Sequence, residues 1–196
     1  MPYLKSEVGK LQISRVWAMP NKWTFKVAPL RAIIDKYKKI DNIWFDPFAG
    51  LCSPCEVTND LNPKIPATCN LDAIDFVRYL RGFDGRYDGA VFDPPYSLTQ
   101  VARSYNNYGL KFNGKDNPTG GFPKVKDIMA DLVITGGYVI SYGWNTVGMG
   151  KSRGFKLIEV LVCCHGGSHH DTLVTVERKL EEASDAISRT KLPGRD

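Results

Sequence analysis

The sequence lacks a hydrophobic run that could cross a membrane, since no stretch approaches the about 18 consecutive apolar residues that a spanning helix needs. Its first residues, Met1 to Lys5, lack the apolar core of a signal peptide. Cysteine is scarce, and five is an odd number that does not suit the disulfide framework of a small secreted protein. We therefore expect a cytoplasmic protein with no membrane partner.

Length and composition predict one globular domain. The chain has 196 residues, which is short for two domains of about 100 to 200 residues each and long enough for one sizeable core. Hydrophobic residues make up 43% and charged residues 24%, an ordinary globular composition that argues against a disordered or fibrous chain. We expect residues 1–196 to form a single domain, without an internal repeat or a linker.

The net charge of +5 is distributed unevenly along the chain. Residues 1–39 carry nine Lys or Arg against two acids, residues 40–100 carry four against nine, and residues 101–126 carry five against one. An acidic centre between two basic segments fits a small-molecule site beside a bound polyanion. The alternative is a solvated, mildly basic surface.

Hydrophobic patterning predicts a chain of alternating strands and helices after an irregular N-terminal arm. Short apolar runs that end in turn residues predict strands at 43–45, 56–60, 89–92, 138–142, 155–164 and 172–177. Helical spacing of apolar residues predicts helices at 30–40, 72–80 and 126–134, the last ended by Gly136-Gly137, and a helical or frayed tail after Lys179. This order indicates an α/β fold with a mostly parallel sheet and an antiparallel C-terminal hairpin.

The tetrapeptide Asp93-Pro94-Pro95-Tyr96 follows a predicted buried strand, at the strand end where open α/β sheets bind ligands. The two prolines remove backbone donors and leave carbonyl oxygens as rigid acceptors next to the Asp93 carboxylate. Such acceptors can hold both hydrogens of an exocyclic amine and orient its nitrogen for attack. Tyr96 offers a face on which a planar base can stack. The alternative is a proline-rich turn with a capping Asp.

Three further acids follow other predicted strands or precede a predicted helix. Asp46 begins the loop Asp46-Pro47-Phe48-Ala49-Gly50, in which glycine allows backbone to approach a ligand. Asp60 closes the next strand and can accept hydrogen bonds from ribose hydroxyls. Asp72 stands at a strand-to-helix junction and could bind an adenine amine. Each acid could instead be a helix cap or a turn former.

These motifs, in this order, resemble the DNA adenine-N6 methyltransferases that use S-adenosylmethionine (SAM), over most of the chain. The segments that carry the resemblance are Thr24-Phe25-Lys26 with Pro29-Leu30, Phe45 to Gly50, Asn59 to Asn62, Leu71-Asp72-Ala73 and Phe92 to Ser97. More narrowly, Ser141 to Asn145 and His165 to Lys179 resemble small phage-encoded adenine methylases. If the protein is phage-encoded, its location is the host cytoplasm.

The resemblance implies a Rossmann-like class I methyltransferase fold and direct methyl transfer from SAM to adenine N6 in DNA. It assigns catalysis to Asp93, Pro94, Pro95 and Tyr96. It assigns cofactor binding to Phe25, Lys26, Asp46, Phe48, Gly50, Asp60, Asp72 and Ala73. The predicted substrate-binding residues are Ser97, Tyr105, Lys111, Trp144 and Asn145. Two alternatives remain, an RNA methyltransferase acting on adenine or guanine amines and a nucleic-acid-binding relative without turnover.

The sequence departs from the family pattern in two places. Only nine residues separate Gly50 from Asp60, so Leu51 to Cys55 must be a short connection without the usual helix. There is also no room for a separate target-recognition domain. Residues 97–126 form the best remaining substrate-binding loop, because they combine cations with aromatic residues, including Tyr105, Tyr108, Lys111, Phe112, Lys115 and Lys124. We therefore predict weak or very short sequence specificity, the alternative being a solvated disordered loop.

Cysteine and histidine residues raise zinc as a competing hypothesis. Cys52 and Cys55 form a C-x-x-C pair, and the further candidate ligands are Cys69, Cys163, Cys164, His165, His169 and His170. No second pair matches the first, and the two adjacent cysteines lie in a predicted apolar strand where free cysteine packs well. We therefore predict no metal site, and expect residues 165–171 to form a hairpin turn near the rim of the active site.

Overall fold

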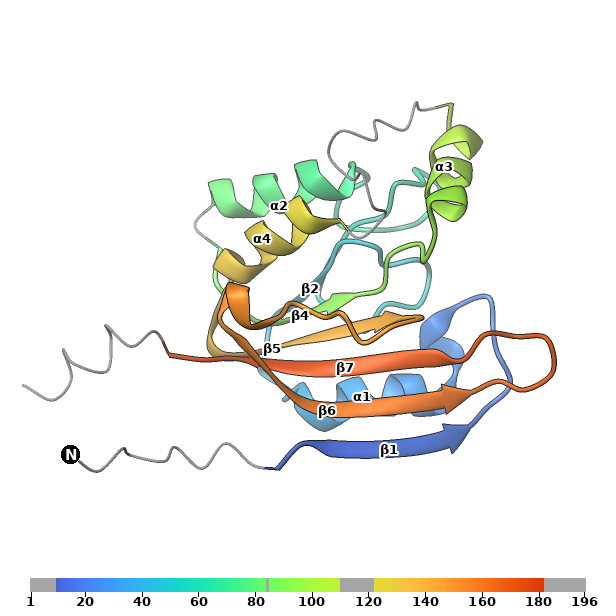
Figure 1. Cartoon of the computed structure of the whole chain (residues 1–196). Coiled ribbons are helices and arrows are strands. Elements are labelled where there is room, and N and C mark those ends of the chain that lie inside the picture. Colours follow the sequence, from blue (N-terminus) through green and yellow to red (C-terminus); the bar gives the residue numbers. More distant parts are fainter. Residues whose placement is uncertain (1–9, 84, 110–121, 182–196) are drawn as a thin grey trace, which may run out of the picture.

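The computed structural model describes residues 10–83, 85–109 and 122–181. Within these ranges, seven strands form one sheet in the order β1-β6-β7-β5-β4-β2-β3 (Figure 1). The strands are β1 (Gln12–Trp17), β2 (Trp44–Asp46), β3 (Val57–Thr58), β4 (Tyr87–Phe92), β5 (Val133–Gly143), β6 (Phe155–Cys164) and β7 (Thr172–Lys179). The α-helices are α1 (Ala28–Tyr37), α2 (Ala73–Gly82), α3 (Leu98–Asn107) and α4 (Pro123–Leu132), with short 3-10 helices η1 (Thr24–Lys26) and η2 (Lys151–Arg153).

Helices pack on both faces of the sheet and enclose two hydrophobic cores. α1 lies on one face, where its buried side chains are Leu30, Ile33 and Ile34. α2 and α4 lie side by side on the other face (Figure 1), and their apolar side chains form one cluster with β4 and β5. α1, α2 and α4 each turn one apolar stripe to the sheet, which is the pattern of a three-layer α/β fold.

The sheet has the mixed topology that the sequence predicts. β2 pairs in parallel with both β3 and β4, β4 with β5, and β1 with β6. β7 lies antiparallel between β5 and β6. The chain passes from β2 outward to β3 and returns to β4 on the other side of β2. Such a reversal opens a crevice at the carboxyl ends of the strands, where ligands bind in open α/β sheets.

Three local predictions are wrong. Residues 12–17, expected in an irregular arm, form β1, which pairs along its whole length with β6. Residues 98–107, expected in a substrate-binding loop over 97–126, form α3. Gly136-Gly137 does not end a helix, because β5 begins at Val133 and runs through both glycines. A Cβ on Gly137 would lie 2.6 Å from the carbonyl oxygen of Asp88, so glycine is needed for the close approach of β5 to β4.

Two further predictions are confirmed. Residues 51–55 contain no helix, and a short irregular connection joins the loop after β2 to β3. β6 and β7 form the expected C-terminal hairpin, with bounds at or close to those predicted. The tail beyond Glu181 lies outside the described residues. Among the described helices, none is both long enough and apolar enough to span a membrane.

Candidate active site

Two cavities open where the carboxyl ends of β4, β2 and β3 lie next to one another in the sheet. The first cavity has a volume of about 440 Å³, and its lining includes Lys22, Thr24, Asp93, Tyr96, Trp144 and His165. The second cavity has a volume of about 320 Å³, and its lining includes Trp23, Phe48, Asp60, Ala73, Tyr105 and Tyr108. Lys22 and Pro95 line both cavities and mark the place where they meet.

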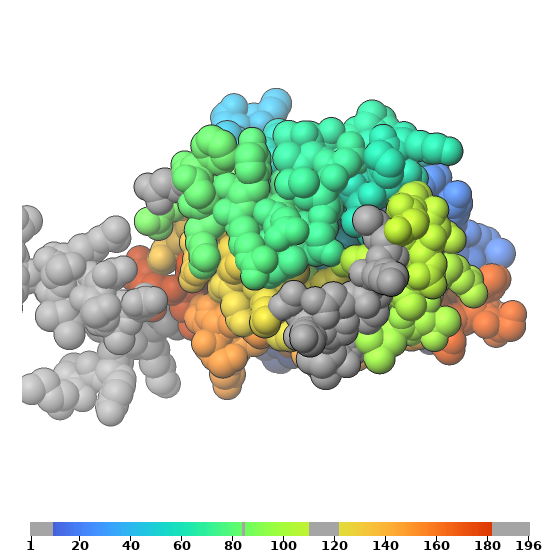
Figure 2. All heavy atoms as spheres, turned by 90° about the horizontal axis from the view of Figure 1, so that it is seen from above, coloured from blue at the N-terminus to red at the C-terminus, as the bar shows by residue number. Residues whose placement is uncertain are grey.

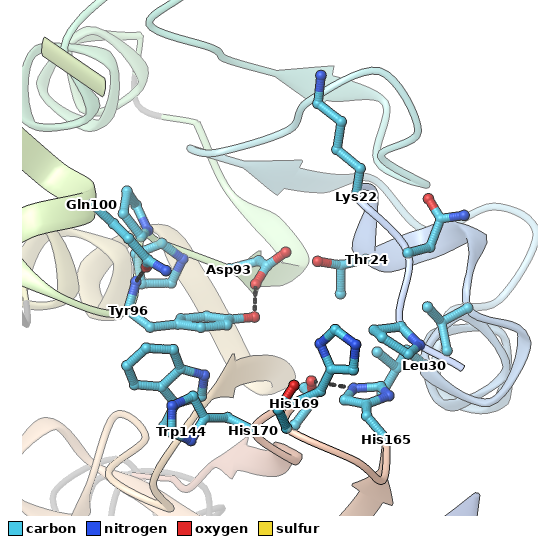
Figure 3. A pocket seen from close by; sticks show the side chains of 17 residues that line it. Lys22, Thr24, Leu30, Asp93, Tyr96, Gln100, Trp144, His165, His169 and His170 are labelled. Carbon is cyan, nitrogen blue, oxygen red and sulfur yellow. Dashed lines mark hydrogen bonds between the residues drawn. The ribbon is translucent and has the colours of Figure 1, made fainter. Parts of the chain in front are cut away.

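Asp93 follows β4 directly and presents its carboxylate to the first cavity. The hydroxyl of Thr24 faces this carboxylate, and Tyr96 lies beside it (Figure 3). Tyr96 Oη donates a hydrogen bond to Asp93 Oδ1 at 2.6 Å. Burial raises the pKa of Asp93 above its ordinary value, and the hydrogen bonds from Thr24 and Tyr96 offset part of that rise. The predicted acceptor group is therefore at the cavity, and one of its oxygens is hydrogen-bonded to Tyr96.

Aromatic side chains form one wall of the first cavity. The ring centroids of Tyr96 and Trp144 are 5.5 Å apart, and those of Trp144 and His170 are 4.6 Å apart. Trp144 is 41% exposed, so part of its ring surface is open to a ligand. Leu30 and His169 lie across the cavity from this wall (Figure 3). The cavity thus combines aromatic surface with a carboxylate acceptor, which suits a planar base that carries an amine.

His165 is a structural tie at the rim of the first cavity. Its Nδ1 lies 2.7 Å from the carbonyl oxygen of Ala18, and its Nε2 lies 2.9 Å from Thr172 Oγ1. The ring therefore connects the end of β1 to the β6–β7 hairpin. The turn that contains His165 lines the cavity, as the sequence predicts, and both ring nitrogens have protein partners.

Asp60 anchors the loops around the second cavity. Its Oδ2 accepts from the Gly50 amide at 2.9 Å, and its Oδ1 accepts from the Asn62 amide at 2.8 Å. Next to it, the buried Asn59 donates to the carbonyl oxygens of Pro47 at 3.1 Å and Leu71 at 3.0 Å. Asn59, for which the sequence indicates no specific role, joins the loop after β2 to the start of α2 through its side chain.

Asp72 and Ala73 form the start of α2 at the second cavity. Asp72 is the N-cap, and its Oδ1 accepts from the Ile74 amide at 3.0 Å. Its Oδ2 accepts from the hydroxyl of Tyr105 on α3. Ala73 lines the cavity and Asp72 is not among its lining residues. The alternative that the sequence left open, a helix cap, therefore describes the contacts of Asp72.

α3 contributes to both cavities, with Gln100 in the lining of the first and Ser104 and Tyr105 in that of the second. Figure 2 shows α3 beside the segment that follows β3, and Ser104, Tyr105 and Tyr108 contribute to the lining of the second cavity. Tyr105, predicted to hold the substrate, is thus on the side of the predicted cofactor residues. Lys111, Phe112 and Lys115 lie outside the described residues, so their predicted role remains a prediction.

Asp46 is buried behind the loop that follows β2 and lines neither cavity. Its Oδ1 accepts from the Phe48 amide at 2.8 Å, and its Oδ2 accepts from Ser53 Oγ at 2.7 Å. Burial, opposed by these two hydrogen bonds, raises its pKa to about 7, and the nearby Asp93 and Asp60 add to the rise. The contacts of Asp46 shape the loop that presents Phe48 to the second cavity.

The N-terminal arm reaches the site through residues next to those predicted. Phe25 is buried with its ring edge-on to Tyr142 at 5.5 Å, and Lys26 is exposed outside both cavities. Instead, Lys22 and Thr24 line the first cavity, and Trp23 lines the second. The turn of η1 thus faces Thr24 into the site and Phe25 into the core. In the sequence, the feature that could have indicated a role for Thr24 is that it is a polar residue shortly before a predicted helix.

Two predicted substrate-binding residues lie beside the first cavity without lining it. Ser97 is the N-cap of α3, and its hydroxyl accepts from the Gln100 amide at 3.2 Å. Asn145 accepts from the Val147 amide at 2.9 Å and lines a smaller cavity of about 210 Å³ behind Tyr96 and Trp144. Both side chains make contacts that shape loops near the site.

The candidate zinc ligands do not form a cluster within the part of the chain that the structure describes. There, no group of three or more Cys, His, Asp or Glu side chains is arranged to hold a metal ion. Cys52 and Cys55 pack against the core on the α1 side of the sheet, and Cys163 lies within that core. Burial raises the pKa of the Cys55 thiol, which favours the protonated form over the thiolate that binds zinc.

Comparison with known proteins identifies the fold. No family model matches the chain, and no curated protein matches it in sequence. One similar solved structure is SMU.776, which is assigned as a methyltransferase and was solved in complex with S-adenosylhomocysteine (SAH). It matches with a TM-score of 0.50 and 12% identity, over 76% of this chain and 48% of that one. TrmN from Thermus thermophilus matches with a TM-score of 0.50 and 18% identity, over 78% of this chain and 49% of that one.

The chain therefore spans about half the length of these two solved structures. Their sequence identities are low, so the likeness concerns the fold. Together with the strand order and the antiparallel β7, it confirms the fold class that the sequence predicts. The chain has the Rossmann-like class I methyltransferase fold.

Proposed function

We propose that this chain transfers a methyl group from SAM to the N6 amine of adenine in DNA, with weak or short sequence specificity. The observation that carries the proposal is the junction of two cavities beside Asp93. One cavity has the acceptors and aromatic wall that suit an aminated base, and the other has the residues that suit an adenosyl group. A methyl group can pass between ligands only if their sites meet, and Pro95 lines both.

The second cavity fits the nucleoside part of SAM. Asp60, at the end of β3, has a carboxylate that accepts hydrogen bonds from two backbone amides and retains further lone pairs for hydroxyl groups. Phe48, Leu61 and Ala73 supply apolar surface for a purine ring. SAM supplies an electrophilic methyl group on a sulfonium when it is bound.

Asp93 and the Pro94 carbonyl would hold the two hydrogens of the target amine. With SAM bound, these acceptors would orient the amine nitrogen toward the methyl group, and methylation would leave the electron pair of the carbon–sulfur bond on sulfur and one proton to be released from the nitrogen. Asp93 can take that proton, because burial raises its pKa above the ordinary value of an aspartate. Tyr96 and Trp144 would contact the ring of the base, which must leave the stack if the substrate is duplex DNA.

The first cavity supports a base-sized substrate. Its volume of about 440 Å³ lies within the range of about 300 to 1,000 Å³ that is usual for small-ligand pockets. Lys22 lies at its rim and can contact a phosphate next to the target base.

Asp93→Ala tests this division of roles. We expect methyl transfer to fall at least about 100-fold, the usual cost of removing a group that acts on the transition state. Calorimetry should show SAM affinity within about twofold, because the second cavity is intact. Asp75→Ala on the exposed face of α2 is the matched control and should leave both quantities unchanged. Loss of SAM affinity with Asp93→Ala, or retained methyl transfer, would contradict the proposal.

A further inference from the structure

β1 carries an exposed apolar row that leads to the first cavity. Ile13 is 71% exposed, Trp17 is 67% exposed and Met19 is 77% exposed. Ile13, Arg15 and Trp17 alternate along the strand, so their side chains point to the same face of the sheet. Gln12 points to the opposite face, where its side chain accepts from Lys36 of α1 at 3.0 Å. The row therefore lies on the face that α1 does not cover.

Trp17 is held in place although it is exposed. The guanidinium carbon of Arg15 lies 5.1 Å from the centroid of the Trp17 ring, and Arg15 Nε donates to Cys164 Sγ at 3.1 Å. On another side, a Cβ on Gly166 would lie 3.3 Å from the Trp17 ring, so the glycine lets the β6–β7 turn lie close to it. A fixed, exposed aromatic ring with a cation beside it is a suitable platform for stacking a base.

The position of Trp17 connects this platform with the candidate active site. Trp17 ends β1 at the same sheet edge as Asp93, and Pro20, three residues further on, lines the first cavity. A chain of three residues spans at most about 11 Å. Bases stacked along one strand are about 3.4 Å apart, so Trp17 is within a few nucleotides of a base held at Asp93.

Charge favours a nucleic acid over other occupants of this surface. Of the eight Lys or Arg in residues 10–39, Arg15 lies on this face, whereas Arg31 and Lys36 belong to α1 on the opposite face. Arg15 lies within the apolar row, and Lys22 lines the first cavity. Cations interleaved with an exposed aromatic ring match the alternating phosphates and bases of a single strand.

We infer that Trp17 and Arg15 bind the single strand that flanks the target nucleotide, with one unpaired base stacked on Trp17. This inference rests on the proposed function for the identity of the strand as DNA. An unpaired base is required, because a base inside a duplex already has neighbours on both of its faces. We therefore expect single-stranded DNA, or a locally opened duplex, to be the preferred substrate.

The test measures binding of a fluorescent single-stranded DNA 12-mer to the full chain, without SAM. Trp17→Ala should raise the Kd about 5- to 150-fold, the loss of one base–aromatic stack. Trp17→Tyr should restore most of the affinity, and Ile13→Ala, an equally exposed apolar truncation on the same strand, should change the Kd less than twofold. Arg15→Gln should lower the slope of log Kd against log salt by about 0.7.

Several outcomes would overturn the inference. One is that Trp17→Ala binds the 12-mer with wild-type affinity, and another is that Ile13→Ala loses as much affinity as Trp17→Ala. A third is a dimer in sedimentation that Trp17→Ala dissociates, because the apolar row would then bind a second copy of the chain. The result is separate from the proposed function. Absence of methyl transfer with an intact Trp17 effect would contradict the proposed function alone, whereas methyl transfer without a Trp17 effect would contradict this inference alone.

Discussion

The hydrogen bond between Tyr96 and Asp93 gives a sharp prediction about the pH dependence of the proposed reaction. Tyr96 Oη donates to the same carboxylate that the target amine would need. Tyr96→Phe removes this donor and keeps the ring that packs against Trp144. The change therefore separates the hydroxyl of Tyr96 from its aromatic surface.

The size of the effect follows from the bond. A hydrogen bond to a charged group contributes about 1.5 to 3 kcal/mol, and one pKa unit corresponds to about 1.4 kcal/mol. Removing the Tyr96 donor should therefore raise the pKa of Asp93 further, by about one unit, since Thr24 remains as a partner. Because the ionised carboxylate accepts the amine hydrogens, the acidic limb of the pH profile should move to higher pH by the same amount. Above that limb, Tyr96→Phe should be at least as active as the wild type, because the amine no longer competes with the hydroxyl.

The assay is single-turnover methyl transfer between pH 5 and 9. Tyr79→Phe, which loses a half-exposed hydroxyl on α2 away from both cavities, is the matched control and should keep the wild-type profile. Tyr96→Ala should lose activity at every pH, because the base then lacks its stacking surface. An acidic limb in Tyr96→Phe that stays in place or moves to lower pH would refute the reasoning.

Two further predictions concern stability. The pKa of Asp46 rises from 3.8 to about 7 on folding, so between these pH values the native state binds a proton that the unfolded state does not. The unfolding free energy should therefore fall by up to about 4 kcal/mol as the pH rises from 4 to 7. Asp46→Asn, which can keep both hydrogen bonds, should lack that fall in urea titrations; parallel curves for the two proteins would contradict it. Gly89→Ala should destabilise the chain by several kcal/mol, because a Cβ there would lie 2.4 Å from the Trp44 ring. A Cβ at Gly82, at the end of α2, would meet no atom within 4 Å, so Gly82→Ala should be neutral or stabilising. Thermal melts compare the two variants, and equal effects on stability would count against the packing of Gly89 on Trp44.

The central elements of the fold could be predicted because their signals are local. β4 and β6 are apolar runs bounded by turn residues, and α2 has a capping Asp72 followed by helical spacing. β1 could not be predicted in the same way, because it is an edge strand whose apolar residues are exposed. β1 forms by pairing with β6, which is far along the chain. Trp17, for example, lies opposite Cys164. α3 buries only Val101, and although Leu98, Val101 and Tyr105 have helical spacing, they begin a polar stretch rich in Asn and Gly that is typical of a loop.

The candidate site shows the same division. Asp93, Tyr96 and Trp144 follow predicted strands, and the structure brings all three to the first cavity. Thr24 and His165 were harder to assign, since their positions depend on how the arm folds over the sheet edge and on one ring that joins Ala18 to Thr172. Asp46 and Asp72 have the residue type expected of ligand-binding acids, yet Asp46 makes local loop hydrogen bonds, and Asp72 caps α2 and accepts from the hydroxyl of Tyr105. Sequence alone does not distinguish these two uses of a carboxylate at a strand end.

Mass spectrometry of nucleosides tests the central claim most directly. The chain is incubated with methyl-labelled SAM and a mixture of single-stranded DNA, duplex DNA and RNA, and the nucleic acids are then digested. The account predicts label in N6-methyl-deoxyadenosine, more from single strands than from duplex, and none when Asp93→Ala replaces the wild type. Label in ribonucleosides or in a base other than adenine, or no label with a folded chain that binds SAM, would contradict it.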